Sequence, residues 1–176
     1  KKVLIVGIDG CRPDALLAAN TPALDGLMNK GAYSFNAQTC ELTLSGPGWA
    51  SMLTGVWPKK HHVVNNSIDG ARFDLYPHFF QRLKETIPEK FTASIVHWAG
   101  LHEKIVTAAD VSATYETDAA VATEAARLLR DTDPDVLFLH FDDVDHAGHQ
   151  NGYGPLIQPY LDAISTVDLW IESVLE

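Results

Sequence analysis

A serine at the start of a predicted helix is one of two features of this sequence that could do chemistry. Ser45 opens the stretch SGPGWASMLTG, whose apolar run predicts a helix ending near Thr54 and Gly55. Serine is a preferred N-cap residue, so the simplest interpretation is that Ser45 caps this helix. The second interpretation makes it a nucleophile, activated by a metal and by the positive helix end, with first-turn amides facing an incoming phosphate. This stretch alone leaves both interpretations open.

The second feature is a cluster of metal-ligand residue types, DDVDHAGHQNGYG, over residues 142–154. Asp145 and His149 are spaced so that they could converge on one cation, and carboxylate with imidazole suits zinc or manganese. The other acidic and histidine side chains of the cluster would orient these ligands. We expect a glycine-rich loop here, in which Gly148 permits a tight turn. A solvated polar loop without a metal is the simpler alternative.

Strands alternate with helices along the chain. Apolar or alternating runs predict strands over residues 2–8, 32–39, 91–100 and 135–143. Periodicity and capping residues predict helices over 21–31, 45–54, 77–87 and 118–130, and a last helix with one apolar face: Tyr160, Ile164, Val167, Ile171 and Val174. This order predicts an α/β fold, a mostly parallel sheet sandwiched by helices.

The predicted sheet would bring the chemical features together. In open α/β sheets, ligands bind beyond the carboxyl ends of the strands. Asp9 directly follows the first strand, and the 142–154 cluster follows another. If Asp9 and Ser45 share a cation, the serine hydroxyl gains the activation it needs. Two further histidines, His97 and His140, are interpreted as packing or core residues.

Composition narrows the function classes. The chain has 176 residues, 46% of them hydrophobic, and a net charge of −10. That length suits one globular domain. No basic stretch is present, which argues against nucleic-acid binding. An acidic protein that handles anionic substrates needs local positive charge, and metal ions are the usual source. Two cysteines are too few for a disulfide scaffold, and no apolar run approaches the length of a membrane span.

With these residues assembled, the sequence resembles the alkaline phosphatase superfamily, in particular its type I phosphodiesterase/nucleotide pyrophosphatase branch. Four segments carry the resemblance, in family order: VLIVGIDGCRPD, NTPALDGLMNKGA, SGPGWASMLTGVWPKKHHV and DHAGH. The resemblance implies an alkaline-phosphatase-like core. It makes Ser45 the nucleophile and assigns metal binding to Asp9, Ser45, Asp145 and His149. It also implies two divalent metal ions, with Zn2+ preferred over Mn2+.

Three departures from the family pattern bear on the chemistry. The phosphodiesterase branch usually has a threonine nucleophile followed by Phe-Pro-Asn, and its asparagine helps to hold the substrate phosphate. Ser45 is instead followed by Gly-Pro-Gly, so that contact must come from elsewhere. Trp49 stands where sulfatases have an arginine, which disfavours sulfatase chemistry. Nothing after residue 155 matches the remaining metal ligands of the family.

The last predicted helix reaches Glu176 without a stop signal. We therefore expect residues 1–176 to be the N-terminal part of one alkaline-phosphatase-like catalytic domain. Both metal sites would then be incomplete, because catalytic zinc usually has three protein ligands. On this expectation the chain alone is inactive.

The resulting functional prediction is a metal-dependent hydrolase of small-molecule phosphate esters that acts through a phosphoseryl intermediate on Ser45. The alternatives are a sulfatase, a phosphotransferase or phosphomutase of the same superfamily, and a non-catalytic binding protein that retains the fold. The resemblance favours a periplasmic or other extracytoplasmic location. Oligomeric state, substrate identity and the pairing of Cys11 with Cys40 stay open at this stage.

Overall fold

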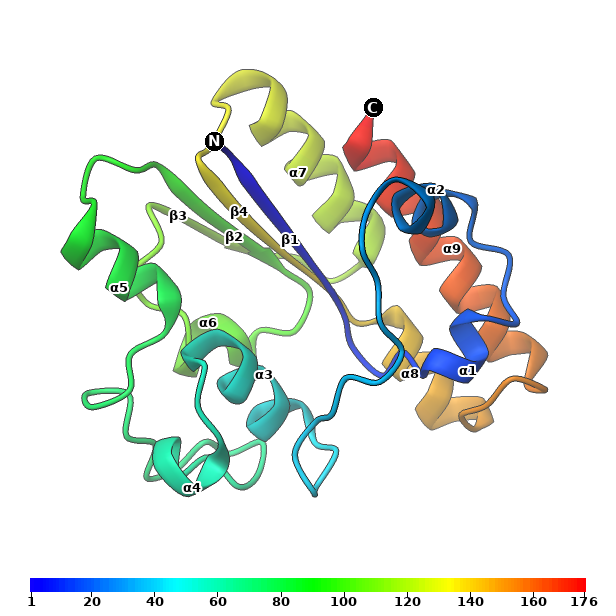
Figure 1. Cartoon of the computed structure of the whole chain (residues 1–176), viewed down its shortest axis with the longest axis horizontal. Helices are drawn as coiled ribbons and strands as arrows, with labels where there is room; N and C mark the ends of the chain where they lie inside the picture. The colour runs from blue at the N-terminus through cyan, green and yellow to red at the C-terminus, as the bar shows by residue number, and fades with distance from the viewer.

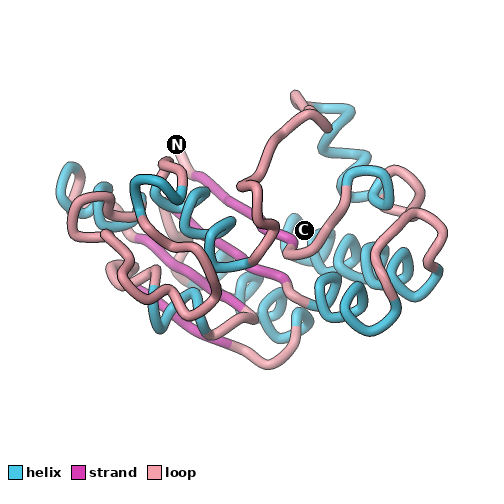
Figure 2. Tube along the Cα trace, turned by 90° about the horizontal axis from the view of Figure 1, so that it is seen from below, coloured by secondary structure: helices cyan, strands magenta, loops and turns pink.

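A computed structural model describes residues 1–176 and shows one four-stranded parallel sheet with helices on both faces (Figures 1 and 2). The strands are β1 (Val3–Ile8), β2 (Thr92–Val96), β3 (Val111–Thr114) and β4 (Val136–Phe141). Their order in the sheet is β1-β4-β2-β3, and all pairings are parallel. The predicted fold class is confirmed. The short edge strand β3 was not predicted, and the other strands are shorter than the sequence suggested.

The helices form the outer layers. They are α1 (Pro13–Leu16), α2 (Pro22–Lys30), α3 (Ser45–Thr54), α4 (Pro58–His61), α5 (Phe79–Thr86), α6 (Gly100–Lys104), α7 (Asp118–Asp131), α8 (Asp143–Asn151) and α9 (Gln158–Leu175). Helices α7 and α9 cover one face of the sheet, and α3, α5 and α6 lie over the other (Figure 1). No helix combines the length and the apolar character needed to cross a membrane.

Alternation along the central strand β4 divides the core in two. Leu137, Leu139 and Phe141 belong to the hydrophobic cluster that includes α7 and α9. Phe138 points the other way, into the cluster that includes α3, α5 and α6. His140 shares the face of Phe138, because successive side chains of a strand point to opposite sides. The sheet therefore presents this buried histidine to the face covered by α3.

The free backbone N–H groups at the start of two predicted helices find different hydrogen-bond acceptors. Thr117 caps α7, and its hydroxyl accepts the backbone N–H of Ala120 at 3.2 Å. Thr21 precedes α2 but makes no side-chain cap bond. The buried carboxylate of Asp168, from α9, instead accepts the first N–H groups of α2, those of Ala23 and Leu24, at 2.9 and 2.8 Å. The predicted apolar face of α9 is buried, and Asp168 lies within it.

Two predictions of local structure are wrong. Residues 32–39 form no strand, because almost all of them are exposed and their alternation has no core to pack against. The expected loop after β4 is helix α8. Gly148 serves close packing there: a Cβ at this position would lie 2.1 Å from the ring of Tyr153, so the glycine admits that ring against the helix.

The carboxyl ends of β1, β4 and β2 lie at one edge of the sheet (Figure 1). Asp9 follows β1, α8 begins two residues after β4, and the first turn of α3 lies beside the end of β1. This edge carries the candidate site.

Candidate functional site at the carboxyl edge of the sheet

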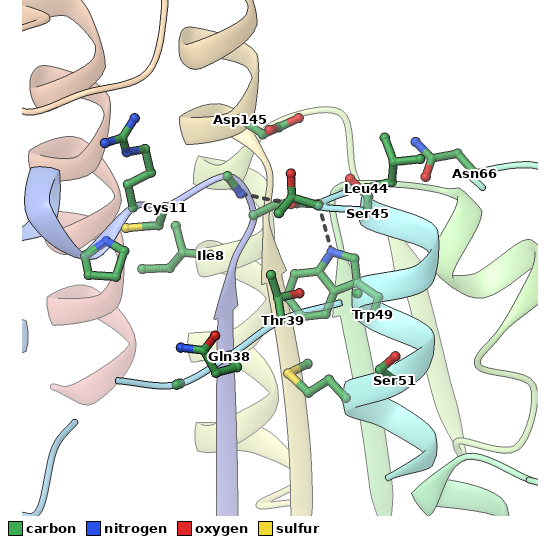
Figure 3. A pocket seen from close by; sticks show the side chains of 18 of the residues that line it. Ile8, Cys11, Gln38, Thr39, Leu44, Ser45, Trp49, Ser51, Asn66 and Asp145 are labelled. Atoms are coloured by element: carbon green, nitrogen blue, oxygen red, sulfur yellow. Dashed lines mark hydrogen bonds between the residues drawn. The ribbon is translucent and has the colours of Figure 1, made fainter. Parts of the chain in front are cut away.

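All four residues predicted from the sequence line one cleft at this edge. They are Asp9, Ser45, Asp145 and His149, and the cleft has a volume of about 1270 Å³. They come from the end of β1, the start of α3 and two consecutive turns of α8. Figure 3 shows the Ser45 and Asp145 side chains directed toward this shared space. The structure therefore brings together every residue that the sequence selected.

Ser45 does not cap α3. Leu44 occupies the N-cap position, and Ser45 is the first residue of the helix proper, so the capping interpretation is wrong. Its side chain faces the cleft and is close enough to Asp9 to help lower the pKa of that carboxyl group. The hydroxyl is thus held at the positive end of a ten-residue helix, beside a carboxylate. That environment suits a nucleophile.

The Asp9 carboxylate is held in place from two sides. Its Oδ1 accepts the N–H of Gly10 at 2.9 Å, and its Oδ2 accepts the indole N–H of Trp49 at 2.8 Å (dashed lines in Figure 3). His140 Nε2 lies 3.5 Å from Oδ2. Burial raises the pKa of Asp9, but the hydrogen bonds from His140 and Trp49 outweigh it and leave that pKa below its usual value. Asp9 is therefore a fixed, ionised carboxylate that could serve as a metal ligand.

Gly7 explains how Trp49 reaches this carboxylate. A Cβ on Gly7 would lie 2.3 Å from the indole ring, so the ring lies directly against the backbone of β1. The same ring packs edge-on against His140 and Phe138, with centroid distances of 4.7 and 5.9 Å. No sequence pattern indicated that Trp49 would orient the aspartate.

Asp145 and His149 form the second pair of candidate ligands. They lie one turn apart on α8, with His149 Nε2 3.2 Å from Asp145 Oδ2. Two ligands of a tetrahedral zinc ion with bonds of 2.0–2.1 Å are about 3.3 Å apart. The hydroxyl of Tyr153 donates to the other oxygen, Asp145 Oδ1, at 2.7 Å. The close approach of α8 requires Gly10, where a Cβ would lie 2.5 Å from Asp145 Oδ1.

The charge of the cleft also fits a divalent metal. Arg12 is its only lysine or arginine, and its guanidinium is paired with Asp14 at 2.7 Å. The carboxylates of Asp9 and Asp145 face the cleft beside histidines, with no lysine or arginine to balance them. Oxygen and imidazole donors with this spacing suit zinc or manganese. The residues present fit a metal site, and a cation there would reverse the sign of the local charge.

The first-turn amides of α3 are largely engaged, contrary to the expectation that they face a phosphate. Gly46 donates its N–H to Asn66 Oδ1 at 2.8 Å, Pro47 has no N–H, and Gly48 bonds to the carbonyl of Leu44. Asn66 itself lines the cleft (Figure 3). Because its Oδ1 accepts from Gly46, its side-chain NH2 group remains a free donor. Asn66 lies 21 residues after Ser45 in the sequence, and no motif pointed to it.

Both cysteines are free thiols. Cys11 lines the cleft, and burial raises the pKa of its thiol to about 11. It therefore stays protonated at neutral pH and is a poor nucleophile or metal ligand. Among the hydroxyl side chains that line the cleft, Ser45 is the one in contact with Asp9.

A parallel α/β sheet with these ligand types at its carboxyl edge is the architecture of the alkaline phosphatase superfamily. Residues 3–110 match the family model of type I phosphodiesterase / nucleotide pyrophosphatase. The chain belongs to that family, as the sequence motifs indicated.

Three known proteins illustrate how similar this chain is to others in sequence and in fold. The catalytic subunit of GPI ethanolamine phosphate transferase 2 from Homo sapiens is 28% identical over 99% of this chain and 19% of its own length. Murine ectonucleotide pyrophosphatase / phosphodiesterase 5 has a TM-score of 0.76 at 20% identity, over 99% of this chain and 52% of its own. Phosphonoacetate hydrolase from Sinorhizobium meliloti 1021 has a TM-score of 0.70 at 19% identity, over 98% of this chain and 52% of its own. This chain thus spans about half the length of these solved structures and a fifth of the curated relative.

Proposed function

We propose that the protein is a metal-dependent phosphoric ester hydrolase of the phosphodiesterase/nucleotide pyrophosphatase type, with Ser45 as its nucleophile. The observation that carries the proposal is the convergence of Asp9, Ser45, Asp145 and His149 on one cleft without an available lysine or arginine. Family membership supports the reaction class. The protein's small-molecule substrate is then a phosphate ester, whose charge the bound cations would offset.

The four cleft residues divide into two ligand sets for two divalent metal ions, with zinc preferred and manganese as the alternative. Asp9 and Ser45 would hold one ion, and Asp145 and His149 the other. Such ions supply charge to the phosphoryl oxygens and lower the pKa of a coordinated hydroxyl group or water. Trp49 and Tyr153 serve this arrangement by fixing the two carboxylates in place.

The chain's own residues then define the chemical steps. Ser45 releases its hydroxyl proton to solvent, and its Oγ attacks phosphorus in line as the bond to the leaving alcohol breaks; the departing oxygen takes a proton from solvent. Ser45 carries the phosphoryl group until water attacks phosphorus and the Ser45 hydroxyl is restored. The free NH2 group of Asn66 is placed to donate to a phosphoryl oxygen. Asn66 thereby supplies the contact that the family places on the asparagine missing after Ser45.

Substitution of the nucleophile tests this proposal. Ser45→Ala should abolish hydrolysis of an aryl phosphate diester by the natural full-length protein supplied with Zn2+, with an unchanged circular dichroism spectrum. Ser45→Thr keeps a hydroxyl and is the matched control, which should retain measurable turnover. Mass spectrometry after acid quenching should find phosphate on Ser45. Full activity of Ser45→Ala would overturn the proposal.

A phosphotransferase is the second candidate, and the relationship to GPI ethanolamine phosphate transferase 2 favours it. The same Ser45 would carry the phosphoryl group, and an alcohol would replace water as acceptor. Product analysis with an added alcohol separates the two, because transfer yields a new phosphate ester in proportion to the alcohol. Both candidates suit a protein outside the cytoplasm, which the resemblance of the chain supports. A non-catalytic binding protein would show neither product.

A further inference from the structure

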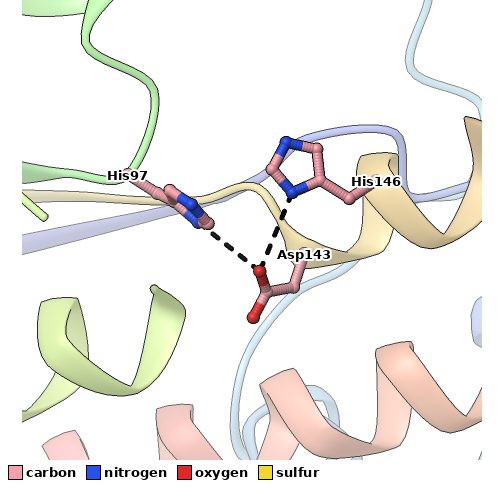
Figure 4. A group of neighbouring side chains, drawn as sticks. All are labelled: His97, Asp143 and His146. Atoms are coloured by element: carbon pink, nitrogen blue, oxygen red, sulfur yellow. Dashed lines mark ion pairs between the residues drawn. The ribbon is translucent and has the colours of Figure 1, made fainter. Parts of the chain in front are cut away.

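Outside the cleft, a second group of metal-ligand side chains lies where β2 and β4 end. His97 follows β2, and Asp143 and His146 lie on the first turns of α8 (Figure 4). Each offers one ligand atom, and these atoms all lie within 4.8 Å of one another. We call these three residues the His97 cluster. The sequence had suggested only packing for His97 and a supporting role for the other two.

The spacing within the His97 cluster is close to that of ligands on one cation. Asp143 Oδ1 lies 3.6 Å from His97 Nδ1 and 3.9 Å from His146 Nδ1 (Figure 4). Two ligands of a tetrahedral zinc ion are about 3.3 Å apart. Small side-chain movements therefore bring the three donors to bonding distance. Two imidazoles and one carboxylate form a donor set that zinc and its neighbours bind well.

The surroundings of the cluster carry an excess of negative charge. The fully buried carboxylate of Asp118 lies 2.8 Å from His97 Nδ1, and Asp142 Oδ2 lies 3.2 Å from His146 Nε2. Three carboxylates thus meet two imidazoles, and no lysine or arginine forms an ion pair with any of them. A divalent cation would balance this charge. A histidine nitrogen binds a metal only when it is deprotonated, so binding through His97 Nδ1 would displace the proton that this atom shares with Asp118.

The supporting contacts hold the cluster in place. Asp118 accepts the backbone N–H groups of Asp142 and Asp143 at 2.9 and 3.0 Å, which ties α7 to the start of α8. The side chain of His97 is only 10% exposed, whereas that of His146 is 53% exposed. The cluster therefore has one rigid, buried side and one side that is open to solvent for entry of an ion.

This group is separate from the cleft ligands on the same helix. At 100° per residue, Asp143 and His146 lie about 110° around α8 from Asp145 and His149. None of the three cluster residues lines the cleft. We propose that His97, Asp143 and His146 bind an additional divalent transition-metal ion, preferentially Zn2+, which joins the end of β2 to the helix that carries Asp145 and His149.

A metal titration of the full chain tests this proposal without any assay of activity. Asp145→Asn with His149→Ala removes the cleft pair and serves as the background. Co2+, which reports its ligands by visible absorption, should bind to this background, and Zn2+ should displace it. Adding His146→Ala should weaken Co2+ binding at least about 10-fold. The control His62→Asn removes an exposed imidazole, suits that residue's left-handed backbone, and should leave binding unchanged.

Absence of Co2+ binding in the background, or equal affinity after His146→Ala, would overturn the proposal. If His146→Ala alters the circular dichroism spectrum, Asp143→Asn provides the second test, because it keeps the size of a half-exposed side chain. Nitrogen NMR of the histidines should show Zn2+ shifting His97 and His146 together. A shift confined to other imidazoles would also count against the site. None of these readouts depends on whether Ser45 is a nucleophile.

Discussion

Trp49→Phe should weaken both the fold and metal binding, because it removes the indole N–H that fixes Asp9. The lost hydrogen bond, 2.8 Å long, goes to an ionised carboxylate; such bonds contribute about 1.5–3 kcal/mol. The smaller ring adds a packing loss of about 1 kcal/mol at this buried position. We expect a decrease of about 2.5–4 kcal/mol in the free energy of unfolding. In a chain of 176 residues this lowers the melting temperature by roughly 5–16 °C.

Urea denaturation measures the change in the free energy of unfolding. Zn2+ titration measures the metal affinity of the cleft, and a His146→Ala background removes the contribution of the His97 cluster. Loss of an orienting partner typically lowers metal affinity about 10–100-fold. Trp57→Phe is the matched control: Trp57 also lines the cleft, is 55% exposed and makes no indole hydrogen bond. It should change stability by less than about 0.5 kcal/mol. Wild-type stability and wild-type Zn2+ affinity in Trp49→Phe would refute the role given to this indole.

Three further substitutions follow from the same contacts. Tyr153→Phe removes the hydroxyl that donates to Asp145 at 2.7 Å, and should lower Zn2+ affinity of the cleft about 10-fold in the same titration. Gly7→Ala places a methyl group 2.3 Å from the Trp49 ring and should cost about 1–3 kcal/mol in urea, whereas Gly26→Ala, with open space around it, should not destabilise. Burial, together with nearby His140, lowers the pKa of His102 to about 4. As the pH falls, His102 is protonated in the unfolded chain near pH 6.5 but in the folded chain only near pH 4. The free energy of unfolding therefore decreases as the pH falls through this range. We expect His102→Gln to reduce the difference between the urea midpoints measured at pH 7 and at pH 5.

The sequence predicted the strands and helices that have a clear apolar pattern, and the reasons for its failures are physical. The runs that became β2 and β4 are buried on both faces, which leaves a continuous apolar signal. The run that became β1 is equally apolar, although β1 is an edge strand and is only half-buried. In residues 32–39, apolar and polar side chains alternate, but the segment packs against no hydrophobic core. The alternation therefore did not produce a strand. In α8, Gly148 is needed for close packing against the Tyr153 ring. The sequence alone did not distinguish this role from that of a glycine in a turn.

The residues of the candidate site also fall into those that the sequence could predict and those that it could not. Residues whose type and motif position carry chemistry, such as Asp9 and His149, could be selected from the sequence, and the structure places them in one cleft. Residues that act through contacts distant in sequence could not be found. Trp49 reaches Asp9 across 40 positions, and Asn66 reaches Gly46 across 20. Such partners depend on how helices and loops pack, and a linear pattern does not record that.

Anomalous X-ray scattering at the zinc edge, on crystals grown with Zn2+ and phosphate, tests most directly whether the cleft binds metal beside Ser45. We expect zinc bound by Asp145 and His149 at about 2.0–2.2 Å from their ligand atoms, and a second position beside Asp9 with Ser45 Oγ facing the phosphate. Crystals in which zinc is absent from the cleft and Ser45 points away from Asp9 would contradict the assignment of Ser45 as a metal-assisted nucleophile.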